Sequence, residues 1–260
     1  LVAEVIDARI PMSSRNPDID AICGKKPRMV ILNRIDMADA DLVGRWSNYF
    51  KDRGMAVIRT DCKSRKGINT FAPAVRQLLS EKLQRYAEKG QVGRPLKLMV
   101  VGIPNVGKST FINQIAGRKG AKAENRPGVT RGKQWVNVDG GLLLLDTPGI
   151  LWPKFDDPEV GMRLAYTGAV KDDILDTETL GCHLMELLAR EYPGALTERY
   201  KIEIPAEIDG WELLQAAGRK RGFLVSGGEV DTERMAKVLL DEYRSCKLGT
   251  FTLERPEELA

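Results

Sequence analysis

One segment, Gly102 to Ser109 (GIPNVGKS), constrains the fold of this 260-residue chain more than any other. It fits the pattern G-x-x-x-x-G-K-[ST], in which glycines let a loop wrap closely around phosphate groups. The loop follows an apolar run, Leu96 to Val101, which predicts a strand, and it opens a predicted helix at about Lys108. A phosphate-binding loop between a buried strand and a helix is typical of an α/β fold with a mostly parallel sheet.

The residues around this loop predict the groups that would hold a triphosphate. Lys108 would reach the β- and γ-phosphate oxygens, and the Ser109 hydroxyl would bind Mg²⁺. A second segment, LLLLDTPG, predicts a strand ending in Asp146, which would also hold Mg²⁺, while the Gly149 N–H would contact the terminal phosphate. Thr130, in the polar segment RPGVT, is a candidate for the second hydroxyl ligand. The alternative for DTPG is an ordinary turn at a strand end.

A candidate base-reading segment lies far upstream of the phosphate-binding loop, where NRID follows the predicted strand RMVIL. The Asp36 carboxylate can accept two N–H bonds from guanine N1 and N2, a donor pair that adenine lacks. Asn33 would tie this loop to the phosphate-binding loop. After the next predicted strand comes TDCKSRKG, where the Cys62 N–H would meet guanine O6 and Lys63 would help to cover the ring.

The order of these segments is reversed relative to the common arrangement, in which the phosphate loop comes first. Either residues 1–90 form an unrelated domain with an accidental NRID, or the chain is circularly permuted. Strand counting favours permutation, because three predicted strands precede the polar linker EKGQVGRP and three follow it, enough together for one sheet. The predicted strands are Leu1 to Ile6, Arg28 to Leu32, Met55 to Ile58, Leu96 to Val101 and a hairpin over Lys133 to Leu145.

Helical spacing dominates the rest of the chain. Before the linker, the pattern predicts helices over Asp39 to Arg53 and Thr70 to Glu88. After Pro153, it predicts helices over Val160 to Ala169, Thr177 to Tyr192, Ile208 to Arg221 and Asp231 to Lys247, with Asp209 and Asp231 as N-caps and a short extended piece at Tyr200 to Ile204. We therefore expect a nucleotide-binding domain over 1–152, with a base-reading half at 1–90 and a phosphate-binding half at 96–152, followed by a small all-α domain over 153–260.

The succession of motifs resembles the circularly permuted bacterial GTPases of the YlqF type, the ribosome biogenesis GTPase A family. The resemblance covers essentially the whole chain and rests on DARIP with the following SSRNP, then NRID, GIPNVGKST, RPGVT and DTPGI, in that order. It implies hydrolysis of GTP to GDP and phosphate, coupled to late assembly of the large ribosomal subunit, with Mg²⁺ as cofactor and with the ribosome raising the activity. It also implies that the helical C-terminal segment contacts rRNA.

The chain departs from the family pattern at several positions. Arg34 replaces the usual Lys of NKxD, and its aliphatic stem could still lie over the base; Asp61-Cys62-Lys63 is an imperfect version of the usual Ser-Ala-Lys. The resemblance also implies a segment ahead of the first strand, and the printed sequence starts at that strand with Leu1. The residues assigned to the nucleotide are Asn33, Arg34, Asp36, Asp61, Cys62, Lys63, Asn105, Val106, Gly107, Lys108, Ser109, Thr110 and Gly149.

The residue after DTPG is Ile150, which cannot orient an attacking water by a hydrogen bond. Similar GTPases use an Asn within the phosphate loop to hold K⁺, and Asn105 occupies that place; the alternative is a loop residue bonded to the backbone. We expect slow hydrolysis by the chain alone, faster in K⁺ than in Na⁺. Because the helical domain follows DTPGILWP directly, the nucleotide state would reorient it.

Composition adds exclusions and alternatives. The apolar runs are too short to cross a bilayer and no signal peptide is visible, so we expect a cytoplasmic protein that contacts no membrane. An organellar source and a removed leader stay open. We also expect the chain to act as a monomer. The net charge of +4, the basic segment AGRKRGF and the later residues Lys237, Arg244 and Lys247 favour contact with RNA phosphates, although a solvated helix face is the simpler alternative. Two other functions stay open: a GTP-dependent switch on another structured RNA such as tRNA, and an adenine-nucleotide enzyme, against which NRID argues.

Overall fold

The computed structural model describes residues 1–120, 134–138, 140–149, 151–152, 155–170 and 176–259. The chain forms two compact units. The first contains residues 1–155 together with 251–260, and the second contains residues 156–250. This differs from the single boundary expected at residue 152, because the chain returns to the first unit for its last ten residues.

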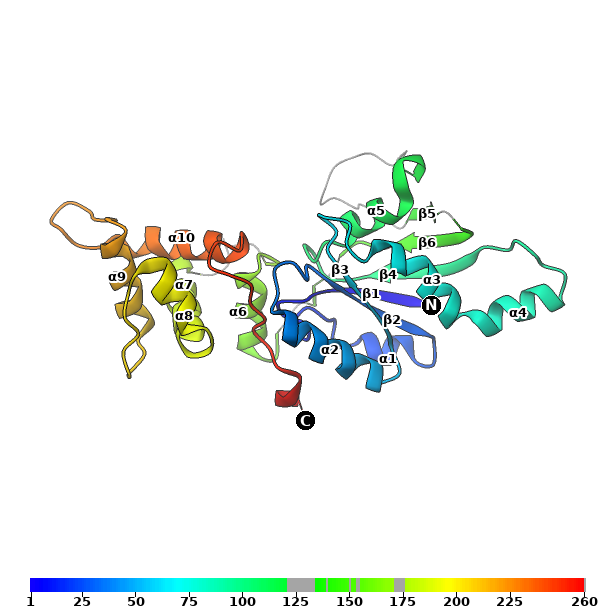
Figure 1. Cartoon of the computed structure of the whole chain (residues 1–260), viewed down its shortest axis with the longest axis horizontal. Helices are drawn as coiled ribbons and strands as arrows, with labels where there is room; N and C mark the ends of the chain where they lie inside the picture. Colours follow the sequence, from blue (N-terminus) through cyan, green and yellow to red (C-terminus); the bar gives the residue numbers. More distant parts are fainter. Residues whose placement is uncertain (121–133, 139, 150, 153–154, 171–175, 260) are drawn as a thin grey trace. The chain divides into compact units, whose positions relative to one another are not determined.

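The first unit is built on one six-stranded sheet with the order β3-β2-β1-β4-β6-β5 (Figure 1). Strands β1 to β4 and β6 are parallel, whereas β5 pairs antiparallel with β6 as a hairpin. Because β1 pairs with both β2 and β4, the two halves of the sequence share one sheet, and the predicted permuted α/β fold is confirmed. The strands are β1 (Val2–Asp7), β2 (Arg28–Asn33), β3 (Ala56–Thr60), β4 (Leu96–Val101), β5 (Gln134–Val138) and β6 (Leu142–Asp146).

Strand β1 lies in the middle of the sheet, and every one of its residues is buried. A strand covered on both faces must be apolar along its whole length, which explains the run of Val, Ala and Ile. Its one charged interior residue, Glu4, is paired with Arg15 at 3.1 Å and with Arg28 at 3.2 Å. These two cations are needed because an unpaired buried carboxylate would be costly.

The helices of the first unit are α1 (Ile19–Cys23), α2 (Ala40–Asp52), α3 (Phe71–Leu78), α4 (Ser80–Glu88) and α5 (Lys108–Gly120). Asp39 caps α2 by accepting the main-chain N–H groups of residues 41 and 42. Trp46 and Phe50 on α2 are fully buried against alternate residues of the sheet. The single helix predicted over residues 70–88 is two helices, because Leu79 leaves the helical conformation; α1 was not predicted.

The second unit consists of α6 (Pro158–Tyr166), α7 (Thr177–Glu191), α8 (Pro193–Tyr200), α9 (Gly210–Lys220) and α10 (Thr232–Arg244). Asp209 and Asp231 accept main-chain N–H bonds at the starts of α9 and α10, which confirms both predicted N-caps. Helix α8 was missed; Pro193 starts it, a position where proline needs no N–H. No helix in the described ranges is long and apolar enough to cross a bilayer.

Several of the basic residues that are predicted to contact RNA bond to other residues of the second unit. Arg221 pairs with the buried carboxylate of Glu242 at 3.1 Å, and Lys237 pairs with Glu233 at 2.6 Å. Arg244 donates to two main-chain carbonyls at the end of α6. Arg219, Lys220, Lys237 and Lys247 are exposed, and of these Lys237 is already paired with Glu233.

Candidate nucleotide-binding site

The phosphate-binding loop and the NRID loop lie at the same edge of the sheet. The first leaves the carboxyl end of β4 and opens α5, and the second leaves the carboxyl end of β2. Only β1 separates these two strands, and all three run parallel. Ligands of open α/β sheets bind at the carboxyl ends of the strands. The topology therefore brings together two loops that lie about seventy residues apart in the sequence.

Asn33 joins the two loops directly. Its side-chain amide donates to the main-chain carbonyl of Val106 at 2.8 Å, which is the tie that the sequence predicts. The oxygen of the same amide accepts from the Thr60 hydroxyl and from the Cys62 thiol, each at 3.1 Å. Because Asn33 is buried and bonded on both sides, it links β2, β3 and the phosphate loop.

Gly107 is required by this junction. Its backbone has φ +93°, a conformation that L side chains rarely adopt. A Cβ at this position would lie 2.3 Å from the Asn33 amide nitrogen, closer than any real contact. Asn105, two residues earlier, also has a left-handed backbone, with φ 61°. The loop conformation and the link to Asn33 therefore depend on each other.

Arg34 makes a second connection between the halves. Its guanidinium donates to the main-chain carbonyl of Asn105 at 2.6 Å and lies 3.7 Å from the Asp7 carboxylate. The fixed guanidinium fork presents one nitrogen to the Asn105 carbonyl and another towards the Asp7 carboxylate. The replacement of the usual Lys thus has a structural use, although its effect on the base stays a prediction.

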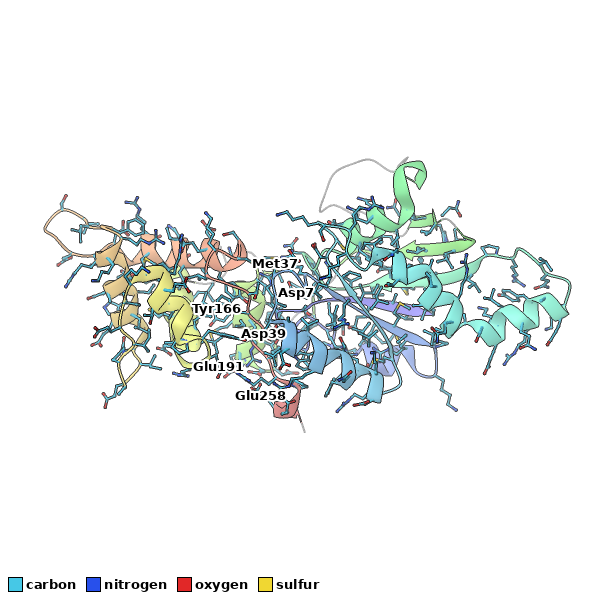
Figure 2. The ribbon with its side chains drawn as sticks, in the orientation of Figure 1. Asp7, Met37, Asp39, Tyr166, Glu191 and Glu258 are labelled. Carbon is cyan, nitrogen blue, oxygen red and sulfur yellow. The ribbon has the colours of Figure 1, made fainter. Side chains whose placement is uncertain are left out.

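The DARIP segment supplies Asp7 and Arg9, to which the sequence assigns no role. Asp7 lies next to Arg34. Arg9 binds the Asp7 carboxylate through two nitrogens, at 3.0 and 2.8 Å, and both side chains are buried. Burial alone would raise the pKa of Asp7, but the Arg9 guanidinium holds the pKa below its usual value. Figure 2 labels Asp7 at the end of β1. The only sequence signal was a charged pair directly after a buried strand.

Asp36, the predicted guanine reader, is exposed. Partial desolvation, and then the nearby Asp61 carboxylate, raise the pKa of Asp36. Asp61 itself accepts the N–H groups of Lys63 and Ser64 at 2.8 and 3.2 Å, so its carboxylate holds its own loop rather than facing outward. Lys63 is exposed, whereas Cys62 is buried, and burial raises the pKa of the Cys62 thiol to about 11. The structure thus brings all these residues to one edge of the sheet.

On the phosphate side, Lys108 and Asp146 bind each other. The ammonium nitrogen of Lys108 lies 2.6 Å from the Asp146 carboxylate, and both side chains are buried. The two predicted phosphate and metal residues are therefore adjacent. The pair keeps either charge from being buried alone, and a bound nucleotide would have to draw them apart.

Gly149 packs against the phosphate loop. A Cβ at this position would lie 2.9 Å from the Pro104 nitrogen, so only glycine lets the DTPG turn approach so closely. Ser109 is half-buried in the first turn of α5, beside Lys108, and Thr110 is exposed. Thr130 and Ile150 lie outside the described residues, so their predicted roles are not placed.

The predicted magnesium ligands suit that ion in their chemistry. Asp146 supplies a buried carboxylate and Ser109 a hydroxyl, and Mg²⁺ prefers oxygen ligands while keeping several waters. The described residues contain no cluster of three His, Cys, Asp or Glu side chains that could cage a metal alone. This edge of the sheet fits a cation shared with substrate phosphates rather than a dedicated protein cage.

With this geometry in view, comparisons with known proteins are informative. A family profile described as "50S ribosome-binding GTPase" matches residues 97–193. Ribosome biogenesis GTPase A of Priestia megaterium is 46% identical over 260 residues, covering 99% of this chain and 90% of that protein.

Solved structures agree with these relatives. A GDP-bound structure of TM YlqF superposes with a TM-score of 0.71 at 27% identity, covering 98% of this chain and 94% of that one. GNP-bound YlqF from T. maritima superposes with a TM-score of 0.69 at 28% identity, covering 98% and 92%. The chain is a GTPase, and it belongs to the ribosome biogenesis GTPase A family.

Proposed function

We propose that this chain binds GTP between its two halves, hydrolyses it to GDP and phosphate, and uses the nucleotide state in late assembly of the large ribosomal subunit. One observation carries the site: the Asn33 amide bonds the Val106 carbonyl, so the guanine-reading loop and the phosphate loop form one pocket edge. The names of the similar proteins supply the ribosomal role. Nothing in the described residues favours tRNA as the partner.

The proposed division of labour follows the geometry. Asp36 accepts guanine N1–H and N2–H, the Cys62 N–H meets O6, and Lys63 covers the ring. Lys108 releases Asp146 and turns to the phosphate oxygens, and the Gly149 N–H contacts the terminal phosphate. Mg²⁺ held by Ser109, Thr130 and Asp146 would neutralise developing charge on the transferred phosphoryl group.

The attacking water needs an organiser other than residue 150, because isoleucine offers no hydrogen bond. We expect slow hydrolysis by the chain alone and stimulation by the ribosome. A K⁺ ion beside Asn105 would add positive charge near the phosphates. The main-chain carbonyl of Asn105 already accepts from Arg34, so the loop backbone is anchored whether or not an ion binds.

The helical unit is proposed to contact rRNA. Since Arg221, Lys237 and Arg244 have internal partners, the contact would depend on the exposed side chains Arg219, Lys220 and Lys247. A phosphate contact of this kind contributes affinity that falls as salt rises. We further propose that the chain acts as a monomer and that the nucleotide state reorients the helical unit.

Three measurements test the proposal: co-sedimentation, nucleotide displacement, and hydrolysis rates in K⁺ and in Na⁺. Purified chain should co-sediment with large ribosomal subunits in the presence of a non-hydrolysable GTP analogue, and less so with GDP. GTP, but not ATP, should displace labelled GDP. Equal displacement by ATP would contradict guanine reading, and co-sedimentation with small subunits instead would contradict the assigned partner. Equal hydrolysis rates in K⁺ and Na⁺ would remove the potassium site alone.

A further inference from the structure

The last residues of the chain cross the guanine-reading edge of the first unit. We call residues 251–257 the C-terminal strap. Phe251, Thr252, Leu253 and Glu254 are all buried, with 2–7% of each exposed, although they form neither helix nor strand. Figure 1 shows this red segment running beside α2, and the turn Pro256–Leu259 contacts that helix. An irregular segment this buried must have its polar groups satisfied by what it crosses.

Thr252 holds two loops at once. Its hydroxyl donates to the Ala8 carbonyl at 3.1 Å and accepts from the Asp39 N–H at 3.2 Å. A hydroxyl has one proton and two lone pairs, so a single Thr can bridge an acceptor and a donor in this way. On either side of it, the Phe251 N–H donates to the Met37 carbonyl and the Leu253 N–H donates to the Arg9 carbonyl. Figure 2 labels Met37 and Asp39 near Asp7.

Glu254 holds the loop after β1. Its carboxylate accepts the main-chain N–H groups of Met12 and Ser13, at 2.6 and 2.9 Å, and also the Ser13 hydroxyl. Its main-chain carbonyl accepts the indole N–H of Trp46 on α2 at 3.0 Å. Hydrogen bonds from several donors to one buried carboxylate are among the strong ones, so this anchor is specific in position as well as in chemistry.

The guanine-reading loop lies between the two places that the strap holds. The Ala8 N–H bonds the Asn33 carbonyl at one end of NRID, and the Met37 N–H bonds the Arg34 carbonyl within it. Ile35 packs against the buried cluster of Ala8, Ala38 and Val43. Strap contacts at residues 8–13 on one side and 37–39 on the other therefore enclose the segment that carries Asp36.

We propose that the C-terminal strap, through Thr252 and Glu254, positions Asp36 for guanine recognition. This inference rests on the proposed role of Asp36. The hydrogen bonds of the strap described above all go to the base-reading half, so its loss should weaken base reading more than phosphate binding. Thr252 and Glu254 are positioning residues, since they act through the loops that they hold.

The test compares four ligands by calorimetry: GDP, ADP, which carries adenine, IDP, which lacks the 2-amino group, and inorganic tripolyphosphate, which lacks the base. Thr252→Val keeps the shape of the side chain and loses the hydroxyl, and Glu254→Gln loses one acceptor. Each should weaken GDP binding about tenfold, as loss of a buried hydrogen-bonded anchor implies, and should shrink the preference for GDP over IDP. Affinity for tripolyphosphate should be unchanged.

Two matched variants serve as controls. Thr252→Ser restores the hydroxyl and should restore the GDP preference. Glu257→Gln removes the ion pair between the strap and Arg45 on the exposed side of α2, away from the enclosed loop, and should change nothing. The proposal is overturned if Thr252→Val keeps the wild-type GDP preference, or if it weakens tripolyphosphate equally. Failure of the wild-type chain to prefer GDP over ADP would instead overturn the guanine site itself.

Discussion

The two halves of the nucleotide site are held in different ways. In the base-reading half, Asn33 and Arg34 already bond the phosphate loop, and Asp61 already holds its own loop. In the phosphate half, Lys108 and Asp146 neutralise each other. In the proposed function, the first half is therefore held in place before the ligand binds, whereas the second must exchange an internal ion pair for contacts with phosphate and cation.

This difference has an energetic consequence. If guanine binds as proposed, loops that are already held in place lose little conformational entropy on binding, so more of the contact energy counts towards affinity and selectivity. The Lys108–Asp146 pair protects two buried charges until a nucleotide replaces it. The proposed function places guanine selectivity in the base-reading half and charge stabilisation in the phosphate half, so substitutions in one half should leave the other property intact.

The largest effect is expected for Asp36→Asn. The amide presents one acceptor and one donor, so it cannot accept both guanine N–H groups, but it matches xanthine, which has a carbonyl at C2. We expect GDP affinity to fall about 10³-fold, or about 4 kcal/mol, and binding of XDP to rise. Competition between the two diphosphates measures both. Unchanged GDP affinity would show that the base is read elsewhere.

The next effect concerns the phosphate half without any ligand. Lys108→Met should lower the free energy of unfolding by about 3 kcal/mol, because it removes the cation that faces the buried Asp146 carboxylate. Lys108→Met combined with Asp146→Asn should recover most of that loss, while nucleotide binding stays lost. Urea denaturation of the nucleotide-free variants measures this cycle. Additive losses in the double variant would show that the two residues are not coupled.

The junction between the halves can be broken at Gly107. In Gly107→Ala, the new Cβ would clash with the Asn33 amide, and the alanine backbone would be strained at φ +93°. We therefore expect the free energy of unfolding to fall by about 2 kcal/mol. Gly44→Ala is the matched control, because Gly44 lies within α2 with no atom within 4 Å of its added Cβ. It should stabilise the chain by up to about 1 kcal/mol. Equal effects of both would contradict a strained junction.

Much of this architecture could be predicted from the sequence, since β1, β2 and β4 are apolar runs bounded by turns, and Asp209 and Asp231 stand where N-caps are expected. The Asn33 link was predictable because both loops leave parallel strands. The strap could not be predicted, because FTLERPEELA shows neither the apolar spacing of a helix nor the alternation of a strand. Its hydrogen-bond partners also lie more than 200 residues away in the sequence. Helix α8 was not predicted for a local reason. Its eight residues do not show the regular apolar spacing of a helix, and an irregular segment follows them.

The smallest expected effect is a pH dependence confined to the base-reading half. Desolvation and the Asp61 carboxylate raise the pKa of Asp36, so this group takes up a proton at a higher pH than an ordinary aspartate. Guanine binds the charged form, since only the carboxylate accepts two N–H bonds. The preference for GDP over IDP should therefore be full where Asp36 is ionised, and should shrink as pH falls through its raised pKa. The phosphate groups of the two ligands titrate alike, so the ratio of their dissociation constants isolates the base. A ratio that stays constant while both affinities fall would assign the pH effect to the phosphate half, where Lys108 and Asp146 must separate, and would reverse the contrast between the two halves.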